Sequence, residues 1–277
     1  MKTIWNTFRL NEKAAVLLFA LILLISALAP VLAPCDPVQV DMSIRFAEPS
    51  AEHLLGTDHL GRDLLSRLMY GGRVSILLSL IATVCSMFAG MMIGLISGYV
   101  GGPLDQGISV ITSLFQGIPR TCFVIAIVGI LKPSTGSLIF ALVITSWAGF
   151  SRVVRTEVIQ VKEKAFMICA RSYGSGFFRM MFSHLLPNIA DNLIVLFTTR
   201  IGQTILSVAS LSFLSLGVQP PTPDWGVMIN DGRGYFYNNI GLILLPFLCI
   251  FAVSWSVNTI GEGLRHYLYR KRDSLEV

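Results

Sequence analysis

Histidines, cysteines and paired carboxylates are the side chains here that could do acid–base, nucleophilic or metal chemistry. The four histidines lie in separate segments, at His53, His59, His184 and His266. The five cysteines, which follow neither a metal-ligand nor a disulfide spacing, are Cys35, Cys85, Cys122, Cys169 and Cys249. No pair of carboxylates recurs within one apolar run, and no Gly-Lys dipeptide is present to form a phosphate-binding loop. The sequence therefore predicts neither an enzyme, nor a metal site, nor a nucleotide-hydrolysing subunit.

Long apolar runs are the elements that must position any site. The chain has 277 residues, of which 53% are hydrophobic and 13% charged, with a mean hydropathy of +0.69. A soluble domain of this composition would expose large apolar patches, whereas a bilayer core of ~30 Å is crossed by roughly 20 apolar helical residues. The runs that meet this need are 14–32, 74–100, 107–131, 137–150, 192–216 and 240–260. We expect an all-α integral membrane protein with six transmembrane helices.

The first run also fits a secretory signal that ends at a lipidated cysteine, because basic residues precede it and Cys35 follows it. A cleaved signal has an apolar region of roughly 7 to 15 residues, whereas residues 14–32 are uncharged throughout and long enough to span. Pro34 is also a poor neighbour for signal cleavage. We therefore interpret this run as the first transmembrane helix.

Basic residues near the runs predict the orientation of the chain, since lysine and arginine favour the cytoplasmic side. We expect a cytoplasmic N-terminal segment at 1–13, a transmembrane domain at 14–265 with a cytoplasmic loop at 152–190, and a cytoplasmic tail at 266–277. The segment between the first two runs resists this rule, because it is placed outside and yet has several arginines. These are Arg45, Arg62, Arg67 and Arg73.

The stretch from Ala170 to Asn188, ARSYGSGFFRMMFSHLLPN, is too polar to cross a bilayer and too hydrophobic for an ordinary loop. Apolar residues recur at helical spacing on both sides of a Gly-Ser-Gly turn at 174–176. We therefore expect a helix, a glycine turn and a second helix that Pro187 ends. Such an amphipathic hairpin lies either on lipid headgroups or on another protein.

This stretch resembles the cytoplasmic loop of the inner-membrane permease subunits of ATP-binding-cassette (ABC) importers, which has an alanine pair, a glycine and a closing Leu-Pro. The chain departs from the pattern where Ile168 replaces a usual glutamate and Cys169 replaces the first alanine. In that family the loop docks a short helix into a groove of the ATPase subunit. The residues that the resemblance assigns to this coupling loop are Cys169, Ala170, Arg171, Gly174, His184, Leu186 and Pro187.

Two further segments, 53–75 and 211–233, resemble the second permease subunit of dipeptide, oligopeptide and nickel importers. The resemblance implies a type I ABC importer permease fold in the bacterial cytoplasmic (inner) membrane, with the coupling hairpin between spans four and five. It also implies a homologous second permease, two ATP-binding-cassette ATPase subunits and an extracellular or periplasmic substrate-binding protein. ATP and Mg would be bound by the ATPases, so no cofactor is expected in this chain.

Two segments that we place outside have residues with structural or docking roles. In GTDHLGRD we expect Asp58 to cap a helix that begins near Leu60, and Asp63 to pair with Arg62 or Arg67. In PPTPDWGVMINDGR the prolines stiffen a loop. There an aromatic residue would either anchor the chain at the membrane interface or contact a docking protein. The candidates for contact with the binding protein are Trp225, Asp231 and Arg233.

Two arginines lie inside the apolar runs, where a charge is costly and marks a functional site by default. Arg200 falls roughly nine residues into the fifth run, near the bilayer midplane at ~1.5 Å per residue. It either pairs with a carbonyl or the partner permease, or lines the translocation path. There it would attract a carboxylate or an anionic metal chelate and repel a bare divalent cation. Arg120 follows Pro119, where the third run is expected to kink.

A gradient-driven carrier or channel is the alternative function. Such carriers tend to place carboxylates or histidines within their spans as proton relays, but the six runs contain none. For an importer, the substrate stays open between peptides and nickel or another metal chelate. The net charge of +5 suits loops that face anionic membrane lipid, and nothing in the sequence indicates nucleic-acid binding.

Overall fold

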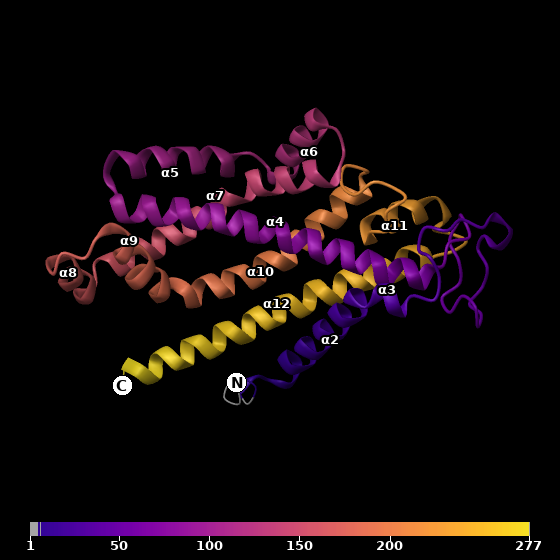
Figure 1. Ribbon diagram of the computed structural model, residues 1–277, viewed down its shortest axis with the longest axis horizontal. Coiled ribbons are helices and arrows are strands. Elements are labelled where there is room, and N and C mark those ends of the chain that lie inside the picture. The colour runs from indigo at the N-terminus through magenta and orange to yellow at the C-terminus, as the bar shows by residue number, and fades with distance from the viewer. Residues whose placement is uncertain (1–4, 6, 277) are drawn as a thin grey trace.

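The computed structural model describes residue 5 and residues 7–276, with side chains as far as residue 268. Its regular structure is helical (Figure 1). In chain order the elements are α2 (Leu10–Ala27), α3 (Ala29–Leu32), η1 (Met42–Ile44), α4 (Leu64–Val100), α5 (Gly102–Gly117), α6 (Arg120–Leu131), α7 (Thr135–Lys162), α8 (Ala165–Ser172), α9 (Phe177–Arg179), η2 (Met180–Leu185), α10 (Leu186–Phe213), α11 (Trp225–Gly232), η3 (Arg233–Tyr235) and α12 (Gly241–Glu276). The expected all-α class is confirmed for the described residues.

In the part of the chain that the structure describes, five helical segments are long and apolar enough to cross a membrane. They are α2, α4, α7, the continuous helix Phe177–Phe213 that joins α9, η2 and α10, and the part of α12 from Gly241 to Leu268. α5 and α6 together would supply a sixth span, but they are bent by 88° at their break. Residues 107–131 therefore do not form one continuous helix. Pro119 lacks a backbone donor and disfavours a helical conformation at Ile118, so the helix stops there.

Several helices extend beyond the apolar runs that predicted them. α4 begins at Leu64 rather than near residue 74, and α7 continues to Lys162 rather than ending near residue 150. α12 passes residue 266 without a break. Residues 1–4, 6 and 277, and the side chains after residue 268, lie outside the described part. They include four basic residues used to predict the orientation, namely Lys2, Arg270, Lys271 and Arg272.

Three glycines let α4 and α7 approach closely. Gly90, Gly94 and Gly98 recur every four residues on one face of α4 and lie against α7. A Cβ placed on Gly94 would stand 2.6 Å from the carbonyl oxygen of Ser151 and 2.8 Å from Cβ of Val154. Small residues at this spacing are typical of close helix contacts in membranes, where packing drives association. The α4–α7 pair is thereby fixed as the centre of the bundle, and α10 packs against it.

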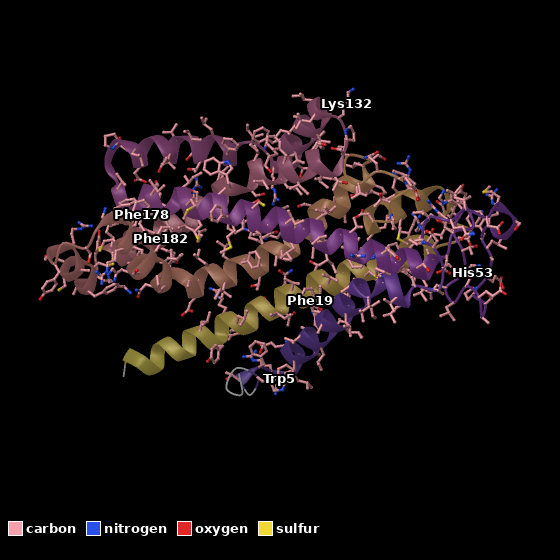
Figure 2. All side chains as sticks on the ribbon, viewed as in Figure 1. Trp5, Phe19, His53, Lys132, Phe178 and Phe182 are labelled. Carbon is pink, nitrogen blue, oxygen red and sulfur yellow. The ribbon has the colours of Figure 1, made fainter. Side chains whose placement is uncertain are left out.

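The bundle has two distinct ends along its long axis, which Figure 1 shows at left and right. α8 and α9 lie at one end, called the α8 end below, and α2 begins and α12 ends toward it. α11 and the segment 33–63 lie at the other, called the α11 end. Figure 2 places Phe178 and Phe182 at the α8 end and His53 at the α11 end. Any path through the bundle therefore connects two differently built surfaces.

Candidate functional site

The turn after α8 depends on one glycine. Gly174 has φ of +76°, a left-handed conformation that residues with a Cβ rarely adopt. Its N–H donates to the carbonyl of Arg171 at 3.0 Å, and the N–H of Ser175 donates to the carbonyl of Ala170 at 3.1 Å. These two bonds satisfy the last carbonyls of α8 in the manner of a glycine C-cap. The turn is thus set by local chemistry, as the sequence predicted.

α8 buries one side chain, half-buries Ala170 and exposes the others. Met167 is buried in a cluster with side chains of α7, η2 and α10. Around it, Ile168 is 58% exposed and Tyr173 is 90% exposed, and Phe178 beyond the turn is 73% exposed. The α8 end therefore presents aromatic and aliphatic side chains on short elements that project from the bundle. An apolar patch of this kind is typical of a surface that meets another protein.

The coupling-loop residues fall into two groups. Cys169, Ala170, Arg171 and Gly174 lie together on α8 and its turn, and the guanidinium of Arg171 lies 5.6 Å from the ring centroid of Tyr99 on α4. The remaining three lie beyond the turn, on η2 and the first turn of α10, and are His184, Leu186 and Pro187. Among the seven, Ala170, His184 and Leu186 are half-buried and the others are exposed. The structure therefore brings the two groups to the same end of the bundle.

The prediction that Pro187 ends the second helix is wrong. Pro187 lies in the first turn of α10, and the chain is helical without interruption from Phe177 to Phe213. A proline crowds the carbonyl four residues earlier and cannot donate to it. The preceding residues, Met180–Leu185, form a wider π turn that accommodates the proline. Consequently one continuous helix connects the α8 end to the interior of the bundle.

At the α11 end, two aspartates have roles that differ from the expected ones. Asp63, not Asp58, caps a helix, because its carboxylate accepts from the backbone N–H and the hydroxyl of Ser66, both at 2.7 Å, where α4 begins. The carboxylate of Asp58 instead accepts from the N–H groups of Leu60 at 2.8 Å and Arg62 at 3.0 Å. This local turn delays the start of the helix to Leu64.

Two buried arginines join this turn to α11. Arg62 donates to Asp58 at 2.6 Å and to Asp231 at 3.0 Å. Arg67 lies 3.4 Å from each of the same two carboxylates and donates to the carbonyl of Pro37 at 3.3 Å. Their side chains are 4% and 1% exposed. Both charges are therefore paired within the protein.

Trp225 takes neither of its expected roles, because its side chain is 1% exposed. Its indole N–H donates to the carbonyl of Leu68 at 3.0 Å, and its backbone N–H donates to the hydroxyl of Ser75 at 3.2 Å. The preceding Asp224 is also buried and caps α11, and burial raises the pKa of its carboxyl. α11 therefore folds into the bundle against α4 instead of lying in an external loop.

Of the other two candidates for docking, Asp231 is held by the arginines described above and Arg233 is exposed. Nearby, the ring of His59 stacks on that of Tyr235 at 5.6 Å. Burial lowers the pKa of His59. The surface at this end is thus a rigid, cross-braced cap in which Arg233 is the docking candidate open to solvent.

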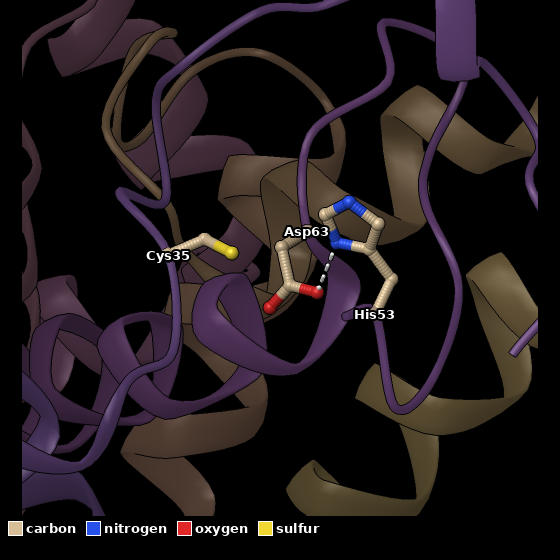
Figure 3. Close-up of side chains that lie close together, drawn as sticks. All are labelled: Cys35, His53 and Asp63. Carbon is tan, nitrogen blue, oxygen red and sulfur yellow. Dashed lines mark hydrogen bonds and ion pairs between the residues drawn. The ribbon is translucent and has the colours of Figure 1, made fainter. Parts of the chain in front are cut away.

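Sequence spacing missed a cluster of three potential metal-ligating side chains (Figure 3). One ligand atom from each of Cys35, His53 and Asp63 lies within 4.8 Å of the others, and Nδ1 of His53 lies 3.0 Å from the carboxylate of Asp63. These are residue types that bind zinc or nickel. Burial and the carboxylates of Asp63 and Glu52 raise the pKa of the Cys35 thiol. As it stands, the His53–Asp63 contact fastens the segment 33–63 to the start of α4.

The interior of the bundle holds the two predicted arginines. Arg200 lies on α10 with its guanidinium 5.6 Å from the ring centroid of Phe150, and donates to the side chain of Gln203 at 3.3 Å. Arg120 begins α6, and two of its nitrogens are buried without a hydrogen-bond partner among the described residues. It lines a cavity of about 160 Å³ together with Ser207 and other residues of α6, α7 and α10. Arg120 is therefore positioned beside an opening within the membrane-spanning bundle, and Arg200 lies on the same helix as Ser207.

Comparison with known proteins identifies what this architecture belongs to. Residues 90–274 match the family of the binding-protein-dependent transport system inner membrane component. The chain belongs to this family. It is 36% identical over 260 residues to the nickel transport system permease protein NikC of Escherichia coli (strain K12), covering 94% of each chain. It is 38% identical over 252 residues to the dipeptide transport system permease protein DppC of Alkalihalophilus pseudofirmus, covering 91% of this chain and 83% of that one.

A third relative is the glutathione transport system permease protein GsiD of Pectobacterium atrosepticum, 35% identical over 273 residues, which are 98% of this chain and 91% of that one. The resemblance drawn from the loop residues is thereby confirmed. The chain is a membrane-embedded permease subunit of an ABC importer and not the subunit that carries out catalysis. The gradient-driven alternative finds no support among these relatives.

Proposed function

We propose that this permease imports peptides, or nickel free or as a chelate, across the cytoplasmic membrane in response to ATP hydrolysis by two ABC ATPases bound at the α8 end. The single observation that carries the proposal is the exposed apolar surface of α8 beside the left-handed turn at Gly174. Exposed aromatic side chains on a segment that projects from the bundle are typical of a surface that another protein covers. The ATPases would bind ATP and Mg, and the permease itself would need no cofactor.

The continuous helix from α9 to α10 supports a mechanism of alternating access. A displacement of α8 and its turn is passed to residue 177, and from there along a continuous helix to Arg200. When the two ATPases close on ATP, the hairpin 162–187 would move and tilt this helix. The path would then open toward the α11 end. Arg200 is proposed to line that path.

A groove between α10 and α12 supports a homologous second permease as the lateral partner. Phe247, Phe251 and Trp255 are exposed at successive turns of α12 and line an opening of about 480 Å³. Membrane lipid could cover these apolar rings, but Asn258 and Glu262 line the same groove, and a carboxylate facing hydrocarbon is costly. A protein partner satisfies both kinds of side chain.

The α11 end is the proposed docking surface for an extracellular or periplasmic substrate-binding protein. Its cross-braced cap gives a fixed shape, and Arg233 offers an exposed charge on it. This assignment places the α8 end, and with it both chain termini, in the cytoplasm. The common direction of the start of α2 and the end of α12 in Figure 1 supports it.

Co-purification tests the proposal directly. The chain, tagged at its carboxyl end in its native host, is expected to recover a second permease and ATPase subunits together with ATPase activity. Gly174→Arg cannot easily adopt φ of +76°, so it should lose the ATPases and transport while the chain still inserts. Gly176→Ala is the matched control, because Gly176 lies in the same turn at φ of −67° with nothing within 4 Å of its added Cβ. Normal uptake by Gly174→Arg would refute the coupling role.

A further inference from the structure

Two arginines stand inside the bundle without a carboxylate partner. Arg120 begins α6 directly after the 88° break, and Arg200 lies on α10. Two of the nitrogens of Arg120 are buried and donate to no group among the described residues. The ion pairs found in the described part of the chain involve neither arginine. Arg120 is therefore held among apolar helices with much of its hydrogen-bonding capacity unused, and Arg200 is held by a neutral partner, the side chain of Gln203.

Arg200 lies on the same helix, α10, as two serines of the cavity that Arg120 lines. The cavity of about 160 Å³ beside Arg120 is also lined by Ser207 and Ser210 of α10. Arg200, Gln203, Ser207 and Ser210 recur three and four residues apart, so they form a single polar stripe along that helix. A cavity of this volume holds a carboxylate with a few waters, at about 30 Å³ per water.

The charge of this region decides which solutes it favours. Two like charges in a medium of low dielectric constant raise each other's energy. Each charge also has an unfavourable desolvation energy unless a counter-ion bonds to it. A carboxylate relieves both costs, because it accepts two parallel N–H bonds from one guanidinium. A bare divalent cation would add a third positive charge, so it is disfavoured.

We propose that Arg120 and Arg200, with the polar stripe on α10, bind the carboxylate group of the transported solute during its passage. This inference rests on the proposed function and narrows it, since the substrate then bears at least one carboxylate. The carboxylate is the C-terminus of a peptide or belongs to a chelator that holds a metal ion. Because α10 continues into the helix that begins at the α8 end, movement of the ATPases would shift one arginine relative to the other and release the solute.

The test uses the complete importer, with its partner permease, ATPases and binding protein, in proteoliposomes. Uptake of alanyl-alanine is compared with uptake of its C-terminal amide, and uptake of Ni²⁺–citrate with uptake of free Ni²⁺. The affinity of the binding protein for each probe is measured separately, and each ratio of uptake rates is divided by the corresponding ratio of affinities. The variants are Arg120→Gln, Arg200→Gln and, as a matched control, Arg73→Gln, since Arg73 is an exposed arginine on α4 that does not line the cavity.

Whether the importer transports peptides or metal chelates, the wild type is expected to take up the probe with a free carboxylate at least about tenfold faster than its matched probe without one. Either glutamine variant should reduce that preference to within about twofold, with ATPase activity and assembly retained, while Arg73→Gln keeps it. If a glutamine variant does not assemble, Arg120→Lys and Arg200→Lys keep the charge but lose the paired bonds, and an undiminished preference in both overturns the inference. An unchanged preference in the glutamine variants overturns it as well and indicates that the partner permease neutralises the arginines. Absence of ATP-dependent uptake of every probe by the wild type would instead refute the proposed function.

Discussion

Replacing Asp58 with asparagine probes the charge cluster at the α11 end. The substitution keeps the size of the side chain. It also keeps one oxygen that can accept hydrogen bonds from the backbone N–H groups of Leu60 and Arg62, as the carboxylate does at 2.8 and 3.0 Å. It removes the charge that faces two guanidinium groups, 2.6 Å away in Arg62 and 3.4 Å away in Arg67. If the NH2 group of the asparagine faced the two arginines, its N–H donors would point at their N–H donors.

The expected loss follows from the burial of the arginines. Their side chains are 4% and 1% exposed, so neither can regain water without moving. Leaving a buried charge without its partner typically costs about 3 to 5 kcal/mol. Asp231 still pairs with both arginines, at 3.0 and 3.4 Å, so we expect the lower end, about 3 kcal/mol. At roughly 2 to 4 °C per kcal/mol for a chain of this size, the unfolding midpoint should fall on the order of 10 °C.

The assay is thermal unfolding of the purified permease in detergent, followed by intrinsic fluorescence. Asp36→Asn is the matched control, because Asp36 is exposed and its carboxylate accepts one backbone N–H, that of Val38 at 2.9 Å. We expect that control to stay near the wild-type midpoint. If Asp58→Asn unfolds at the same temperature as Asp36→Asn, the two arginines do not depend on Asp58 and the reasoning from burial is wrong.

Three other predictions test the packing, the orientation and the pH response. Gly94→Ile should abolish folded protein, because its Cβ would stand 2.6 Å from a carbonyl oxygen of α7, whereas Gly107→Ala meets nothing within 4 Å and should fold. A membrane-impermeant maleimide should label Cys35 in intact cells, slowly because its pKa is raised, and Cys169 only after permeabilisation; the reverse pattern would invert the proposed orientation. Burial lowers the pKa of His59, so the unfolded chain takes up a proton there first and stability falls as the pH drops through the ordinary histidine range. When the pH is lowered from about 7.5 to about 5.5, the temperature of the unfolding midpoint should therefore fall less in His59→Gln than in the wild type. An equal fall would contradict this.

The features that sequence predicted well depend on neighbours along the chain. The apolar runs locate helices because about 20 consecutive apolar residues are stable as a helix across the bilayer core, whatever they pack against. The turn after α8 was predictable because a glycine at Gly174 permits a left-handed backbone, and the apolar residues around it recur at helical spacing. The interruption at Pro119 was likewise signalled, since proline acts on its own helix.

The features that sequence reasoning mispredicted depend on residues far apart in the chain. Asp231 is 164 residues from Arg67, and nothing local to either indicates that they meet. An aromatic residue after a run of prolines looks the same in sequence whether it faces lipid or, as Trp225 does, packs on α4. Asp58 and Asp63 are both good helix caps, and nothing local shows that Asp58 instead pairs with two arginines that Asp231 on α11 also holds.

By itself, the sequence determined that this protein lies in a membrane, that its regular structure is helical, and that a polar hairpin leaves the bundle near Gly174. Hydropathy and backbone preference are properties of short segments, so they can be read without the fold. Only the tertiary structure decided that α5 and α6 are bent by 88°, that Arg62 and Arg67 are neutralised, and that Arg120 lines a cavity with two serines of α10. Those outcomes depend on which helices pack together, and that is set by the shapes of surfaces that the sequence does not place side by side.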